Sequence, residues 1–178
     1  MNRTGKRRKA VMYAEAVVAD AKSSEAWSTW EDDLGALALL VSEEHGRRFL
    51  QNTSVSIDER VAAAERAAEG TISPRGFGLL RLLAEERDVD LMDDIRQRVI
   101  RASDEALGVD RVHVTTAIEL EESAVQDLRN RLEEPTRTLR MTTDVDDNLL
   151  GGFLIRRGDD VLDLSVRARL ISLAATLR

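Results

Sequence analysis

The stretch that decides the fold is LLGGFLIRRGDDVLDLSVRARL, residues 149–170. It contains the glycine pair Gly151-Gly152, a short apolar segment, the dipeptide Gly158-Asp159 and a second short apolar segment. Two short strands joined by a two-residue turn that contains glycine predict a β-hairpin. Ser165 is a candidate N-cap, so a helix is expected directly after the hairpin. Because no obvious catalytic group lies here, the glycines and the serine are interpreted as structural.

The residues before this hairpin alternate between strand and helix patterns. Residues 112–117 alternate in polarity and predict a strand, as do residues 139–143. Between them, residues 121–134 carry apolar side chains at helical spacing. The helix after Ser165 supplies a second helix. Residues 108–178 are therefore expected to form an α+β domain in which two helices cover a short β-sheet.

The first part of the chain has helical periodicity throughout. Its clearest apolar stripe repeats at steps of three and four and includes Trp27, Trp30, Leu34, Leu37 and Val41. Short connections separate the successive helical segments, so residues 10–107 are expected to form a six-helix bundle with both tryptophans in its core. Residues 1–9 are expected to form a basic flexible tail. The fold class is mainly α with a small α+β part.

Charge and composition limit the possible functions. The net charge is −7, and residues 1–9 carry +5, so the remaining chain carries −12 (−7 minus +5). Such an acidic body disfavours nucleic acid as a partner. The basic tail alone is a weak indication of an anionic partner, and a solvated, disordered end is the favoured interpretation. No cysteine is present, and no apolar run is long enough for a membrane span. A secretory signal pattern is also missing, so a cytoplasmic location is expected.

Known catalytic and cofactor motifs are not found in the sequence. Residues 76–78 are Gly-Phe-Gly, but no third glycine or preceding strand completes a dinucleotide fingerprint. His45 and His113 have no histidine or cysteine neighbours at metal-ligand spacing. Residues 144–148 begin like a calcium loop, yet the glycine and glutamate that such a loop needs further on are missing. We therefore expect no catalytic, metal or cofactor site.

The order of parts and the hairpin stretch resemble the delta subunit of F-type ATP synthases, which is equivalent to the mitochondrial oligomycin sensitivity-conferring protein. The residues 13–16, Tyr-Ala-Glu-Ala, are similar to the opening of that family. The C-terminal pattern that carries the resemblance consists of Gly151, Gly152, Arg156, Gly158, Asp159, Asp163, Ser165, Arg167 and Arg169. Leu164 and Ala168 stand where the family pattern has glycine, which identifies a divergent member.

The resemblance implies a stator subunit that performs no catalysis and holds no cofactor. Its C-terminal domain would contact the C-terminal ends of the b subunits of the peripheral stalk, and its helical domain would bind the N-terminal helices of alpha subunits. One copy per complex is implied, at the cytoplasmic face of a bacterial plasma membrane and attached only through the complex. The implied alpha-binding groove between the first and fifth helices consists of Ala10, Tyr13, Ala14, Val17, Gly76, Phe77 and Leu80. Small residues would let a partner helix approach closely.

Other interpretations remain open from the sequence alone. The chain could be a free-standing helical adaptor in signalling or transcription, or a small-molecule enzyme whose site has no familiar motif. Ala14 could belong to the internal core instead of a binding groove. Likewise, the charged residues of the C-terminal pattern could either fix that corner of the fold or contact a partner.

Overall fold

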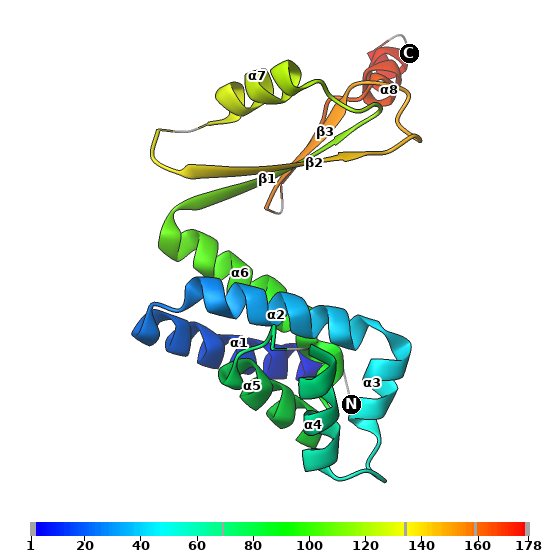
Figure 1. Ribbon diagram of the computed structural model, residues 1–178. Helices are drawn as coiled ribbons and strands as arrows, with labels where there is room; N and C mark the ends of the chain where they lie inside the picture. The colour runs from blue at the N-terminus through cyan, green and yellow to red at the C-terminus, as the bar shows by residue number, and fades with distance from the viewer. Residues whose placement is uncertain (1–2, 69, 134, 159, 177–178) are drawn as a thin grey trace. The chain divides into compact units, whose positions relative to one another are not determined.

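The computed structural model describes residues 3–68, 70–133, 135–158 and 160–176. It is mostly helical with one small sheet, as expected (Figure 1). The chain divides into two units, Met1–Ser103 and Asp104–Arg178, so the division falls inside a helix and before the boundary expected at 107/108. An ion pair between Arg111 Nε and Asp104 Oδ1 at 2.7 Å fastens the last turn of that helix to the following strand.

The first unit consists of helices packed around one apolar core. Leu34, Leu37, Leu80, Leu83 and Ile95 are completely inaccessible to solvent, and Trp30 is buried while Trp27 packs at the edge. The elements of this unit are α1 (Arg3–Ser24), α2 (Trp27–Ser42), α3 (Glu44–Gln51), α4 (Ile57–Ala68), α5 (Pro74–Glu85), the 3₁₀ turn η1 (Val89–Leu91) and α6 (Met92–Leu107).

Helix α1 begins at Arg3, so the expectation of a flexible tail is wrong for residues 3–9. Acidic groups near η1 explain this difference. Lys6 Nζ lies 3.7 Å from Asp90 Oδ2, and Lys9 Nζ lies 2.6 Å from Asp88 Oδ2. The sequence pattern could not reveal these partners because the residues lie about eighty positions apart in the chain.

Two helix starts follow the local signals in the sequence. The amide of Glu59 donates to Ser56 Oγ and the amide of Ser56 donates to Glu59 Oε2, each at 3.2 Å, which forms the expected capping box before α4. Ser73 Oγ accepts from the amide of Gly76 at 3.3 Å, and Pro74 takes the first helical position of α5. These local predictions are confirmed.

The second unit contains a four-stranded sheet of order β2-β1-β3-β4. β1 and β2 are parallel, and α7 forms the crossover that a parallel pair requires, whereas the β1–β3 and β3–β4 pairs are antiparallel. The elements of this unit are β1 (Val109–Thr116), α7 (Glu122–Leu132), β2 (Thr138–Val145), β3 (Phe153–Arg157), β4 (Asp160–Asp163) and α8 (Val166–Thr176).

The core of the second unit is small and lies on one face of the sheet. Val112, Val114 and Ile155 are buried there, and Leu128 and Leu132 of α7 pack against them. The expectation that both helices cover the sheet is wrong for α8. The large apolar side chains of α8, which are Val166, Leu170, Ile171 and Leu173, remain exposed and do not belong to this core. A helical stripe in the sequence indicates which face is apolar, but it does not indicate what covers that face.

Candidate functional site

The residues expected to line a groove on α1 and α5 lie mostly in the core of the first unit. Ala10, Tyr13, Ala14 and Val17 are at most 4% exposed. On α5, Leu80 is fully buried, Gly76 is buried and Phe77 is half-buried. The expectation that this face is open to a partner is therefore wrong in this structure. The small side chains do permit close helix approach, but the approaching helices belong to the same unit.

Gly76 lies where α5 approaches α2 closely within that core. A side chain added there would meet the carboxylate of Asp33 on α2 and the side chain of Ile72 at 2.7–2.9 Å. Asp33 itself is buried, and its carboxylate accepts hydrogen bonds from both the amide and the hydroxyl of Ser73. This cluster fixes the start of α5 against α2, so its role is structural.

A second polar cluster joins α1 to the segment after α5. The buried carboxylate of Asp88 accepts hydrogen bonds from Lys9 Nζ at 2.6 Å and from Tyr13 Oη at 3.1 Å. Burial raises the pKa of Tyr13 above its ordinary value of 10.0, and the hydrogen bond to Asp88 raises it further. The hydrogen bond to Asp88 also raises the pKa of Lys9. Both Tyr13 and Asp88 are buried, so these pKa shifts belong to a structural contact inside the first unit and not to an open site.

The solvent-exposed residues between α1 and α5 are one or two positions along the chain from the residues predicted to line the groove. Lys9 pairs with Glu86 at 3.5 Å, and Arg75 pairs with Asp20 at 2.9 Å. The two helices are therefore antiparallel neighbours, tied near both ends.

Between these ties, four small or apolar residues face solvent. We call them the α1–α5 strip: Met12 and Ala16 on α1, and Gly78 and Leu82 on α5. Met12 is 55% exposed and Leu82 44% exposed, while Ala16 and Gly78 are also exposed. In each helix the two residues are four positions apart and so share one face. The main apolar stripe of each helix faces the core, so the helical pattern in the sequence does not indicate this strip.

The glycines and polar residues of the C-terminal pattern mainly shape the chain. A side chain on Gly152 would collide with the backbone of Leu164. Ser165 Oγ accepts from the amide of Ala168 at 3.1 Å and therefore caps α8, as predicted. The hydrogen bond from the Ser165 side chain lowers the pKa of Asp163, and the Ser165 amide, which donates to Asp163 Oδ1 at 2.9 Å, lowers it further.

The remaining members of that pattern lie in several places. Gly151 accepts a backbone hydrogen bond from Val166 at 2.9 Å, and Gly158 follows β3 in a left-handed conformation. Arg156, Arg167 and Arg169 are exposed. Asp159 lies outside the described residues. The structure therefore explains the glycines, Asp163 and Ser165 as scaffold, whereas the three arginines are available at the surface.

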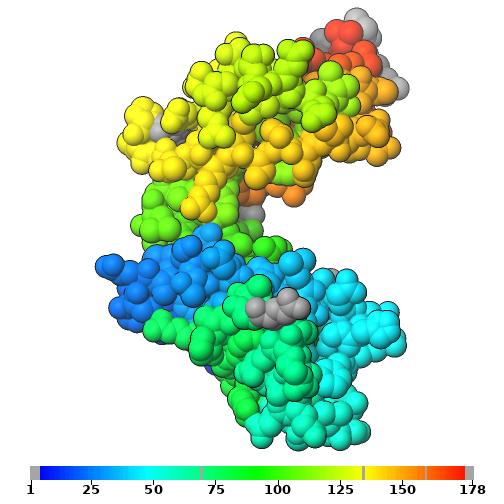
Figure 2. Space-filling view, in the orientation of Figure 1, coloured from blue at the N-terminus to red at the C-terminus, as the bar shows by residue number. Residues whose placement is uncertain are grey.

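Several large apolar side chains of β4 and α8 are exposed to solvent. In Figure 2 the atoms of α8, coloured red, belong to the outer surface of the second unit. We call this the β4–α8 surface, and its side chains are between 42% and 63% exposed: Val161, Leu162, Val166, Leu170, Ile171 and Leu173. An apolar area of this kind is typical of a protein–protein contact.

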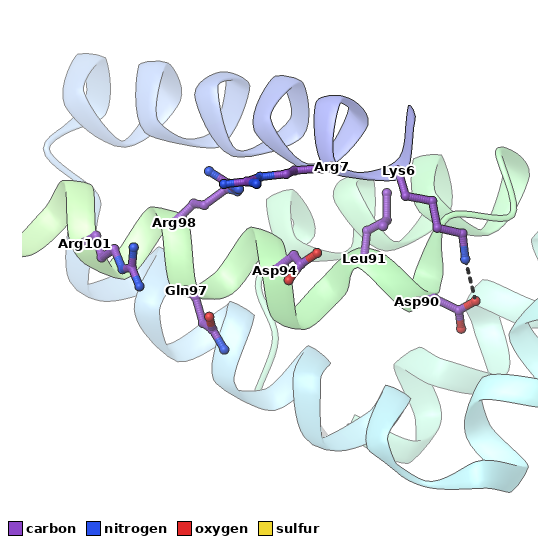
Figure 3. Close-up of a pocket in the computed structure, with 8 residues that line it drawn as sticks. All are labelled: Lys6, Arg7, Asp90, Leu91, Asp94, Gln97, Arg98 and Arg101. Carbon is purple, nitrogen blue, oxygen red and sulfur yellow. Dashed lines mark ion pairs between the residues drawn. The ribbon is translucent and has the colours of Figure 1, made fainter. Parts of the chain in front are cut away.

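Helices α1 and α6, with η1, enclose a basic cleft of about 810 Å³ (Figure 3). It is lined by Lys6, Arg7, Asp90, Leu91, Asp94, Gln97, Arg98 and Arg101. The described residues include no cluster of three or more histidine, cysteine or acidic side chains that could hold a metal ion. In that same part of the chain, no helix combines the length and apolar character needed to cross a membrane.

Comparisons with known proteins identify the family. The family model for the ATP synthase delta (OSCP) subunit matches residues 10–177. An ATP synthase subunit delta from Thioalkalivibrio sulfidiphilus is 34% identical over 172 residues, with 93% of each chain covered, and one from Teredinibacter turnerae is 30% identical with the same coverage.

The fold also has a match among solved structures. A chain in the cryo-EM structure of the Toxoplasma gondii mitochondrial ATP synthase hexamer matches with a TM-score of 0.67 at 19% identity, covering 97% of this chain and 96% of that one. At this identity the likeness concerns the fold alone. The family match and the curated relatives together include both units of the chain. The protein described here therefore belongs to the ATP synthase delta (OSCP) subunit family, whose members are non-catalytic components of a membrane-associated complex.

Proposed function

We propose that this chain is the stator subunit that links the catalytic head of a bacterial F-type ATP synthase to its peripheral stalk. The family match over residues 10–177 is the observation that carries this proposal. Such a link resists rotor torque, so rotation changes the conformation of catalytic sites instead of turning the head. The first unit, as a six-helix bundle, would bind alpha-subunit N-termini and the second unit would bind the b subunits, at the cytoplasmic face of the plasma membrane.

The α1–α5 strip is the alpha-binding surface in this proposal. Exposed Gly78 has no neighbour within 4 Å of an added side chain, so an incoming helix can approach α5 closely there. Met12 and Leu82 flank this low point and supply apolar contacts. Helix-in-groove recognition requires this combination of small residues and apolar anchors. The proposed binding surface therefore lies on the same two helices as the groove expected from the sequence, but it consists of exposed residues instead of buried ones.

The β4–α8 surface is the stalk-binding surface. Its apolar residues come from a sheet edge and from the adjoining helix, and the helix has no buried residue among those described. Leaving several large apolar side chains in water is unfavourable, by roughly 25 cal/mol for each Å² of apolar area. A partner helix that covers α8 would remove this cost. Exposed Arg167 and Arg169 beside it would pair with acidic residues of that partner.

Two pairs of substitutions test these surfaces separately. The full chain is titrated with a peptide from the alpha-subunit N-terminus and with a C-terminal fragment of the b subunit. Met12→Asp with Leu82→Asp is expected to weaken alpha binding by about tenfold or more, since loss of apolar anchors dominates interface energies. Leu170→Asp with Leu173→Asp is expected to weaken b binding to a similar extent. Each pair should leave the other interaction unchanged.

Leu39→Asp is the matched control, because Leu39 is 72% exposed on α2 and lies outside both surfaces. Circular dichroism checks that every variant remains folded. If the wild-type chain binds neither partner, the stator proposal is wrong. If it binds both but the Leu39 variant loses alpha binding instead of the strip variant, the stator function stands and the assignment of the strip fails.

A further inference from the structure

The basic cleft carries a local charge opposite to that of the whole chain. Its lining includes four cationic side chains, Lys6, Arg7, Arg98 and Arg101, and two anionic ones, Asp90 and Asp94. The cleft therefore has a formal charge of +2 (four minus two), whereas the chain carries −7. Concentrating positive charge in a concave site focuses the field on an entering anion.

Two of the cationic groups, Lys6 and Arg98, differ in their contacts. Lys6 pairs with Asp90 at 3.7 Å. The Nε atom of Arg98 is buried and has no hydrogen-bond partner in the described part of the chain. In Figure 3, Arg7 comes from α1 and Arg98 from α6, so both helices that line the cleft contribute a guanidinium group. Like charges in one cleft repel each other, a bound anion would reduce this repulsion, and an unsatisfied buried donor is unfavourable.

We propose that the basic cleft binds a small anion that carries phosphate groups. Guanidinium groups match phosphate oxygens through paired hydrogen bonds, and Arg7 on α1 and Arg98 on α6 both line the cleft. Gln97 Nε2 donates one hydrogen bond to Asp93 at 3.0 Å and has a second N–H for a ligand. The volume of about 810 Å³ lies within the range of small-molecule sites. Leu91 is the single apolar residue of the lining, so the cleft lacks the anchors that a docked helix would need. This site is separate from the α1–α5 strip and independent of the proposed stator contacts.

Titration calorimetry of the full chain with inorganic pyrophosphate tests the proposal. Arg7→Gln is expected to weaken binding by about tenfold, because a hydrogen bond to a charged group is lost. Arg8→Gln is the matched control, since Arg8 is adjacent on α1 and exposed but does not line the cleft. It removes the same charge and should leave the affinity within about twofold. Asp94→Asn removes a competing carboxylate and should strengthen binding.

Arg98→Gln should weaken binding as Arg7→Gln does, and circular dichroism separates this effect from unfolding. Two results would overturn the proposal: no heat of binding from pyrophosphate at low salt, or equal losses in the Arg7 and Arg8 variants. Vesicles distinguish the source of the phosphate. Flotation with phosphatidylglycerol vesicles that depends on Arg7 but not on Arg8 identifies a lipid headgroup as ligand, whereas pyrophosphate binding without flotation identifies a soluble one.

Discussion

At the scale of single residues, Ala14 lies in the core of the first unit and Ala16 lies on its surface. Ala14 is 4% exposed, and Ala16, two positions later, faces solvent. Ala14→Trp is therefore expected to destabilise the first unit by about 1–3 kcal/mol, because a much larger side chain at a buried position displaces its neighbours. Ala16→Trp should change the free energy of unfolding by less than about 0.5 kcal/mol. Urea denaturation followed by circular dichroism measures both.

The same pair distinguishes stability from binding. Ala16 belongs to the α1–α5 strip, so Ala16→Trp should weaken alpha binding while the protein stays fully stable. Ala14→Trp should affect binding only as far as it unfolds the chain. Equal stability of the two variants would show that the side chain of Ala14 is not enclosed as described here.

Tyr13 is the single tyrosine of the chain, so its ionisation can be followed directly. Burial and the hydrogen bond to Asp88 raise its pKa, so the tyrosinate absorbance should rise with a midpoint above 10.0. The unfolded chain ionises at lower pH than the folded chain. The stability contributed by this raised pKa is therefore complete below pH 10 and is lost as the pH rises through the folded pKa.

The raised pKa of Lys9 acts in the same direction, with its loss beginning near the ordinary value of 10.5. Asp88→Asn should lower the pKa of Tyr13 only in part, since burial is the larger cause and remains. A midpoint at or below 10.0 in the folded wild-type protein would contradict the buried position of the phenol.

At the scale of elements, the junction between β3, β4 and α8 depends on one glycine. Gly152 has φ +80°, and an added side chain would collide with the Leu164 carbonyl and approach Ser165 Cα to 2.9 Å. Gly158 also has a positive φ, of +59°, but has open space around it. Gly158→Ala should cost about 1 kcal/mol through backbone strain alone, and Gly152→Ala should cost more than about 2 kcal/mol.

Hydrogen exchange of the β3 and β4 amides measures these two effects in the second unit. Both variants place alanine at a left-handed position, so their difference isolates the collision at Gly152. A similar loss of protection in both variants would mean that the backbone of Leu164 can move aside. The N-cap contact of Ser165 with Ala168 should weaken together with the Gly152 variant, because both belong to the same junction.

At the scale of the whole molecule, two separate cores predict separate responses to mutation. Leu34 is fully buried in the first unit, so Leu34→Ala should destabilise that unit by about 2–5 kcal/mol. Trp27 and Trp30 both lie in the first unit, so tryptophan fluorescence reports its unfolding. Hydrogen exchange of β1 reports on the second unit. We expect the fluorescence transition to shift and the β1 protection to remain.

Joint shifts of fluorescence and β1 exchange would contradict this independence and would mean that the chain unfolds as one unit. The reciprocal variant is Val114→Ala, since Val114 is fully buried in the sheet core. It should reduce β1 protection and leave tryptophan fluorescence unchanged. The two variants thus test the division of the chain from both sides.

The sequence by itself determined the local structure and the family. Apolar spacing indicated the helices, polarity alternation indicated the strands, and the capping box at Ser56 and the start at Ser73-Pro74 formed as predicted. These features depend on residues a few positions apart, whose interactions are set by helix and strand geometry. The pattern around Gly151, Gly152 and Ser165 lies at a junction where close packing requires glycine. The same pattern also identified the family.

Only the tertiary structure decided which apolar faces are covered. Small residues on α1 and a stripe on α8 have similar helical spacing in the sequence, yet Ala14 is buried and Leu170 is 56% exposed. Long-range pairs such as Lys9 with Asp88 likewise stabilise helix α1 over residues 3–9, which were expected to belong to a flexible tail. The physical reason is that periodicity specifies the direction of a side chain relative to its own helix, whereas burial depends on which other element packs against that face.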